Sequence, residues 1–276
     1  MLPAGKTQKI PANFQYRSGP PPLVCSLASS SFAYGETNTG FARSANEDCF
    51  GYHAVSTCEP MLFAVADGIG GHGNGDIASH LLIRMLLTSW RDFRNAIPSG
   101  RQELADALTK LITACNRRIF ELNEAAENPI PMGTTLALLL VMPDYALTLH
   151  LGDSRVYVLR ENGPLLPLTI DHSYVTQLLR TGQITPAQAE SHPLSHVILR
   201  SVGPALNVVP EIHFHDRLPG DRYMLCSDGV TTHLKDNRIE EIMRSSDSAA
   251  DAVRTMINAS LREGGRDNIT AVCAYL

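Results

Sequence analysis

The 276-residue sequence has no apolar run long enough to cross a bilayer. Its longest run, around LALLLVM, is far shorter than the roughly 20 residues that a spanning helix needs. The amino terminus carries prolines and polar residues where a signal peptide would carry its apolar core. The six cysteines show no C-x-x-C spacing, which is typical of reduced thiols. We therefore expect a soluble cytoplasmic protein with no membrane partner.

Positive charge is also scarce. Lys and Arg number 23 against 28 Asp and Glu, which gives a net charge of -5, and we find no local basic patch. This balance lacks the electrostatic footprint of a nucleic-acid-binding protein. We expect no nucleic-acid partner and a monomeric chain.

Prolines and serines are concentrated at the amino-terminal end. Residues 1–32 are therefore predicted to form a flexible leader, followed by one folded domain over residues 33–276. The hydrophobic content of 44% is enough for a sizeable core. Short helical pieces and polar joints over residues 171–200 predict an excursion beside the sheet, and such insertions often border a binding site.

Apolar periodicity within the domain predicts strands, two helices, many strands, a helix and a closing strand. Helical spacing is found over 77–90, 104–119 and 249–261, and strand-like runs over 49–55, 61–67, 134–142, 145–153, 155–160, 207–215, 221–228 and 268–276. This order lacks the strict alternation of a parallel doubly wound sheet. The predicted fold class is α+β, with antiparallel sheet and helices on its outer faces.

The segment FAVADGIGGHGNGDIAS, residues 63–79, is the most glycine-rich loop of the domain. It lacks the Lys and final hydroxyl of a Walker loop, and it does not fit the dinucleotide fingerprint. Nucleotide binding is therefore disfavoured. A metal-binding loop and a tight turn remain as its interpretations.

Five aspartates lie at the ends of predicted strands: Asp48, Asp67, Asp153, Asp228 and Asp267. Any one of them has a sufficient explanation in turn chemistry. Taken together, carboxylates at strand ends without clustered His or Cys favour hard cations such as Mg²⁺ or Mn²⁺ over zinc. The carbonyl of Gly68, which follows Asp67, is a further hard oxygen ligand for such a cation.

At this point the ordered motifs resemble one family, the metal-dependent Ser/Thr protein phosphatases of the PPM (type 2C) class in their bacterial form. The matching segments are RSANED, VADGIGGHGNGDIAS, GTTLALLL, HLGDSRVYVLR, TIDHS, ILRSVG, LCSDGV and GGRDNITAV, over residues from about 35 to 276. The resemblance implies an α-β-β-α sandwich with a metal cluster at one end. It also implies that the excursion over residues 171–200 is the family's flap.

The resemblance further implies which residues bind metal. Two Mn²⁺ or Mg²⁺ ions would be held by Asp67, Asp228, Asp267 and the Gly68 carbonyl. Glu47 and Asp48 match the family's acidic pair, which reaches the metals directly or, as expected for Glu47, through water. A third ion would use Asp153 together with Asp228.

Two further residues are candidates for the chemistry. Arg43 stands at the family's phosphate-binding arginine, where a guanidinium can pair two phosphoryl oxygens. His72 is a candidate general acid, with a hydrogen bond that organises the loop as its alternative. Asp76 stands where the bacterial pattern has Glu, and we interpret it as a helix-start carboxylate. Other histidines, His150 and His213 among them, show no ligand spacing.

The function implied is hydrolysis of phosphoserine or phosphothreonine on proteins by a metal-activated water, opposing a bacterial Ser/Thr kinase. Two alternatives stay open: a phosphatase with one narrow regulatory target, and an inactive relative that only binds phosphoproteins. The second is disfavoured because every metal-binding carboxylate is retained. A third interpretation makes the leader a docking or regulatory arm.

Overall fold

In a computed structural model that describes residues 32–70, 74–126 and 130–276, eleven strands form two sheets in which every pairing is antiparallel. One sheet has the order β1 (Ala33–Asn38), β11 (Ile269–Tyr275), β10 (Arg222–Cys226), β7 (Arg155–Leu159) and β8 (Leu165–Pro167). The other has the order β2 (Asp48–His53), β3 (Met61–Ile69), β5 (Leu136–Val141), β6 (Tyr145–Leu151) and β9 (Glu211–Asp216), with β4 (Gly133–Thr134) paired to β3.

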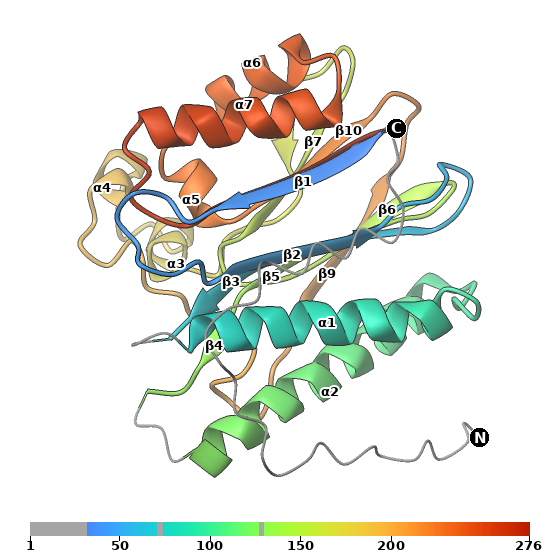
Figure 1. The fold of residues 1–276 in the computed structure, drawn as a ribbon, viewed down its shortest axis with the longest axis horizontal. Coiled ribbons are helices and arrows are strands. Elements are labelled where there is room, and N and C mark those ends of the chain that lie inside the picture. The colour runs from blue at the N-terminus through green and yellow to red at the C-terminus, as the bar shows by residue number, and fades with distance from the viewer. Residues whose placement is uncertain (1–31, 71–73, 127–129) are drawn as a thin grey trace.

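Helices cover the outer face of each sheet (Figure 1). Those outside the sheet of β2 are α1 (Gly75–Phe93) and α2 (Arg101–Ala126), and those outside the sheet of β1 are α6 (Asp236–Ser245) and α7 (Ala249–Arg262). Three short helices complete the chain: α3 (Tyr174–Arg180), α4 (Pro186–Glu190) and α5 (Asp228–Thr231). The α+β class and the α-β-β-α sandwich expected from the sequence are confirmed.

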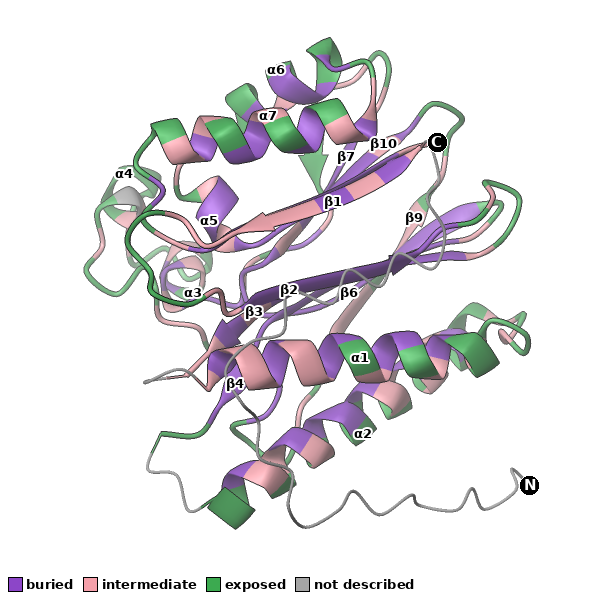
Figure 2. Cartoon of the chain, in the orientation of Figure 1, coloured by how far each residue is buried: buried purple, intermediate pink, exposed green. Residues whose placement is uncertain are grey.

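Three apolar layers hold the sandwich together. One lies between the two sheets and includes Phe63, Leu139 and Val272, and one lies between each sheet and its helices. In the central strand β5 every residue is buried, because both faces are covered (Figure 2). In α7 the buried positions recur at helical spacing, and Ser248 caps its first turn by accepting from the Asp251 N–H.

The excursion over residues 171–200, which we call the flap, contains α3 and α4 as the predicted short helical pieces. Its two ends meet, since the Leu199 N–H donates to the His172 carbonyl at 2.7 Å. Residues 1–31 lie outside the described part of the chain, so the leader and the boundary at 32/33 stay predictions.

Candidate metal centre

Strand register brings the first two candidate carboxylates together, because Asp48 opens β2 directly opposite Asp67 of β3. Asp48 is almost fully buried, and its Oδ2 accepts from the Ser227 hydroxyl at 2.7 Å and the Thr270 hydroxyl at 2.6 Å. Its Oδ1 has no hydrogen-bond partner. Burial raises the pKa of Asp48 to about 7, despite the two hydroxyl donors.

The backbone around Asp67 is held by the two threonines of the GTT motif. The Asp67 carbonyl accepts from the Thr134 hydroxyl and the Thr135 N–H, and the Asp67 N–H donates to the Thr135 hydroxyl. Burial raises the pKa of the Asp67 carboxyl well above its usual range, and the charges of the other four junction aspartates raise it further. The structure therefore brings all five predicted aspartates to one place.

Asp228 and Asp267 lie next to strands of the other sheet. Asp228 opens α5 after β10, and Asp267 lies just before β11. Burial raises the pKa of Asp228, and the charge of Asp267 adds to that effect. Arg43 reaches Asp267 with an Nη2–Oδ2 distance of 2.8 Å, and its side chain is 53% exposed. This hydrogen bond raises the pKa of Arg43, so a permanent positive charge lies at the open side of the group.

Asp153 follows β6 and completes the group, which with Glu47 and Arg43 we call the aspartate centre. The residue is buried, and its Oδ1 has no hydrogen-bond partner. Burial raises its pKa to about 7, and the charges of Asp228 and Asp171 add to this.

Glu47 joins the glycine loop to the aspartates. Its Oε1 accepts from the Gly75 N–H at 3.2 Å, and its carbonyl accepts from the Gly68 N–H at 3.0 Å. Burial raises the pKa of Glu47. A Cβ atom at Gly68 would overlap the Gly75 carbonyl, so only glycine fits at this close approach.

The donor set of the centre fits hard divalent cations. Buried carboxylate oxygens without partners are costly, and here they belong to two aspartates of one like-charged group. Such a group needs cations beyond Arg43, and oxygen-only ligands suit Mg²⁺ or Mn²⁺. In the described residues one trio alone has ligand atoms all within 4.8 Å of one another, and it is not of this centre. The aspartate oxygens are more widely spread, as suits two ions about 3.5–4 Å apart.

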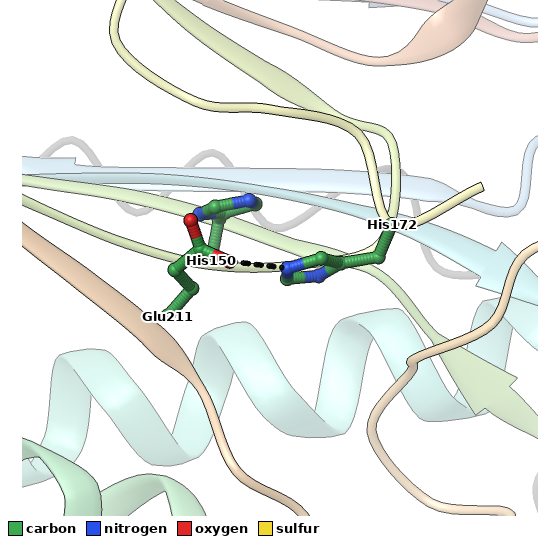
Figure 3. A group of neighbouring side chains, drawn as sticks. All are labelled: His150, His172 and Glu211. Atoms are coloured by element: carbon green, nitrogen blue, oxygen red, sulfur yellow. Dashed lines mark hydrogen bonds and ion pairs between the residues drawn. The ribbon is translucent and has the colours of Figure 1, made fainter. Parts of the chain in front are cut away.

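That trio is His150, His172 and Glu211, which we call the Glu211 cluster (Figure 3). Sequence spacing gave no sign of it, because its members lie on β6, at the start of the flap and on β9. The register places His150 directly opposite Glu211.

Residues that support the centre were also missed from the sequence. Asn268 accepts from the Glu47 N–H at 2.8 Å, and its amide donates to the carbonyls of Thr39 and Ala45 at 2.9 Å each. Ser227 and Thr270 hold Asp48. Each of these three supporting residues lies within three positions of a predicted metal ligand, and this proximity in sequence could have identified them.

Two predictions around the glycine loop have different outcomes. His72 lies outside the described residues, so its role as general acid stays a prediction. Asp76 lies in the first turn of α1, where its Oδ1 accepts from the Ile77 N–H at 2.7 Å. This contact agrees with a helix-start carboxylate.

The chain is similar to proteins of known family. A family model described as Protein phosphatase 2C matches residues 42–272. The serine/threonine phosphatase stp of Listeria monocytogenes is 34% identical over 236 residues, which cover 86% of this chain and 92% of that protein.

Solved structures agree with that match. Stp1 of Staphylococcus aureus has a TM-score of 0.80 at 29% identity, covering 91% of this chain and 97% of that one. The catalytic domain of the phosphatase PstP, solved with two manganese ions, has a TM-score of 0.74 at 32% identity, covering 88% and 96%. Among the described helices, none is both long and apolar enough to span a membrane.

Proposed function

Because the chain belongs to the protein phosphatase 2C family, and is thus a metal-dependent serine/threonine protein phosphatase, we propose that the aspartate centre is its active site. The observation that carries this proposal is the pair of buried, unpartnered oxygens, Asp48 Oδ1 and Asp153 Oδ1, within a group of carboxylates that raise one another's pKa.

Asp67, Asp228, Asp267 and the Gly68 carbonyl would hold two Mn²⁺ or Mg²⁺ ions. Asp48 would contribute directly and Glu47 through water, and Asp153 with Asp228 would hold a third ion. When bound, such cations lower the pKa of water to near neutral and offset the charge of a phosphoryl group.

Arg43 would bind the phosphoryl group of the substrate. Its side chain is exposed and anchored at one nitrogen to Asp267, which leaves other N–H donors of the guanidinium for phosphoryl oxygens. Bidentate pairing would fix the orientation of the phosphoester relative to the aspartates, and orientation is a large part of catalysis in phosphoryl transfer. His72 is the proposed donor of a proton to the leaving oxygen.

The biological setting is inferred from the activity. Opposition to a cognate Ser/Thr kinase follows from the activity, since a phosphoprotein substrate needs an enzyme that phosphorylates it. A narrow regulatory target is the alternative, and the flap would decide between them. A monomeric state and a cytoplasmic location also stay proposals; the latter is supported by the described cysteines, among which no disulfide forms.

The test of the active site is hydrolysis of para-nitrophenyl phosphate and of a phosphothreonine peptide, with and without Mn²⁺, by the wild type and Asp228→Ala. We expect turnover that needs the metal and is lost in the variant. Turnover without metal, or an unaffected variant, would refute the proposal. Activity on the small ester alone would keep the centre and reject the phosphopeptide as its substrate.

A further inference from the structure

The hydrogen bonds of the Glu211 cluster fix its protonation state. The Gly152 N–H points at Nδ1 of His172 at 3.2 Å, and a backbone N–H can only donate. The ring proton of neutral His172 is therefore on Nε2, which donates to Glu211 Oε2 at 3.0 Å. Burial lowers the pKa of His172, which agrees with a neutral ring.

The same geometry argues against a metal ion in the cluster. The lone pairs of an imidazole lie in its ring plane, and the rings of His150 and His172 are stacked, with 4.4 Å between centroids and 9° between planes. Two nearly parallel, stacked rings do not aim at one point. Nε2 of His172 is also already protonated and used, so the cluster is complete through hydrogen bonds, except for Nδ1 of His150.

Both ends of the flap reach the Glu211 carboxylate. His172 belongs to the first end, and at the other end Arg200 Nη1 lies 3.9 Å from Glu211 Oε2. Arg200 Nη1 is 3.4 Å from His172 Nε2, and because both nitrogens are donors they converge on a shared acceptor. Burial works to raise the pKa of Glu211, but hydrogen bonds from His213 and His172 outweigh it and lower the pKa to about 2. The carboxylate is therefore charged at neutral pH.

Apart from an ion pair between Asp171 and Arg155 of β7, with an Nη2–Oδ2 distance of 2.7 Å, few contacts fix the position of the flap. Within residues 181–200 no described residue is buried, and the buried apolar residues of the flap are Val175 and Leu178 of α3. A segment with few buried apolar contacts has low local stability. Its placement therefore depends on the polar contacts where it leaves and rejoins the sheet.

His172 also connects the flap to the aspartate centre. The backbone N–H of His172 donates to the Gly152 carbonyl at 2.9 Å, while its ring Nδ1 accepts from the Gly152 N–H. Gly152 directly precedes Asp153 and has a φ of 102°, a conformation that favours glycine. Both bonds between His172 and Gly152 are made without Glu211, so the turn that presents Asp153 stays in place when Glu211 is replaced.

We propose that Glu211 is a positioning residue that fixes both ends of the flap to β9 and thereby sets the affinity for protein substrates, without taking part in the chemistry. The substrate part of this inference rests on the proposed function, because it requires the phosphoprotein to contact the flap. The positioning part does not, and can be measured without any substrate.

The test compares Glu211→Ala and Arg200→Gln with a matched control, His213→Gln. His213 donates to the other oxygen of the same carboxylate at 2.8 Å, but it lies on β9 and not on the flap. Hydrogen–deuterium exchange of flap amides should accelerate about tenfold in Glu211→Ala, as expected for loss of a charged hydrogen-bond acceptor. It should accelerate less in Arg200→Gln and stay unchanged in His213→Gln.

Kinetics supply the second measurement. In Glu211→Ala, KM for a phosphothreonine peptide should rise about fivefold to tenfold, with kcat for para-nitrophenyl phosphate within about twofold of wild type. Equal flap exchange in Glu211→Ala and wild type would overturn the inference, as would an equal response of His213→Gln. A wild type that is inactive on both substrates would refute the proposed function, while the exchange result would still decide the positioning role.

Measurement of bound metal tests the alternative that the Glu211 cluster is a metal site. One equivalent of a transition metal that is present in wild type, retained in Asp228→Asn and lost in both Glu211→Ala and His150→Gln would overturn a hydrogen-bonded cluster in favour of a metal site. We expect no metal that depends on His150.

Discussion

The aspartate centre and the Glu211 cluster are joined through neighbouring residues, since Asp153 belongs to the centre and Gly152 bonds His172 of the cluster, but their charges are balanced in opposite ways. In the cluster the Glu211 carboxylate meets His172, and also His213 and Arg200 from outside the cluster, and its pKa is lowered to about 2. In the aspartate centre carboxylates face one another, and the pKa values of Asp48 and Asp153 are raised to about 7.

The difference distinguishes a structural polar group from a functional one. A set of charges that is satisfied by its own neighbours holds segments of the chain in place. A set whose oxygens stay unpartnered and whose charges repel is unfavourable for folding, and it is suited to bind what the chain itself lacks.

The largest effect is expected when one charge is removed from the aspartate centre. Asp228→Asn keeps the side-chain volume but loses a ligand, so Mn²⁺-dependent kcat should fall at least about 100-fold. Without metal, the same variant should be more stable to urea by about 1 kcal/mol, because burial and the charge of Asp267 both disfavour the ionised Asp228 carboxylate. A variant that loses both activity and metal-free stability would contradict the claim that the carboxylates of the aspartate centre destabilise the fold when no metal is bound.

The second prediction concerns Arg43, the one cation paired with the centre in the described residues. Arg43→Lys keeps the charge but not the planar fork, so kcat/KM should fall about tenfold. Because the arginine side chain is 53% exposed, the urea midpoint should hardly change. Unaltered kcat/KM would remove Arg43 from phosphoryl binding.

The third prediction concerns metal binding, which should offset the repulsion among the carboxylates of the aspartate centre. A fixed Mn²⁺ concentration, equal to 100 times the Kd at pH 8, should raise Tm at that pH by about 5–10 °C in differential scanning fluorimetry. The increase should be larger at pH 8 than at pH 6, because Asp48 and Asp153, with pKa values of about 7, must lose protons to act as ligands. Asp228→Asn is the control and should show a smaller increase at both pH values.

The smallest effect is expected from His215, a half-buried histidine of β9 that lies outside the aspartate centre. Burial lowers the pKa of His215 to about 4, while its unfolded-state value is 6.5. The unfolded chain therefore binds more protons below pH 6.5, so the free energy of unfolding should decrease as the pH falls from 6.5 to 4. In His215→Gln the urea midpoint should depend less steeply on pH over this range; an equal slope would exclude His215 as the source.

The sequence predicted what depends on local pattern. Strongly periodic segments such as β5, α1 and α7 were expected, and the junction aspartates indicated the centre. The first strand, β1, was not predicted, because its polar and glycine residues give no clear alternation. The four-residue helix α5 is too short for any periodic signal. Helix α6 was also missed, although Ile239, Ile242 and Met243 have helical spacing.

Contacts between distant segments could not be predicted. The two hydroxyls that hold Asp48 come from residues 179 and 222 positions later in the chain. The Glu211 cluster depends on the pairing of β6 with β9 and on the closure of the flap. No periodicity in one sequence encodes such pairings; they arise when the sheets assemble.

The position of β11 has a consequence for how the protein matures during synthesis. This strand is the last described element to be translated, yet it lies between β1 and β10 inside its sheet. It brings Thr270 to Asp48, and it is directly preceded by Asp267 and Asn268. The aspartate centre therefore cannot form on a chain that is still being elongated through residue 270. With the aspartate centre as the proposed active site, a nascent chain would gain phosphatase activity only after β11 has been synthesised and has paired with its neighbours.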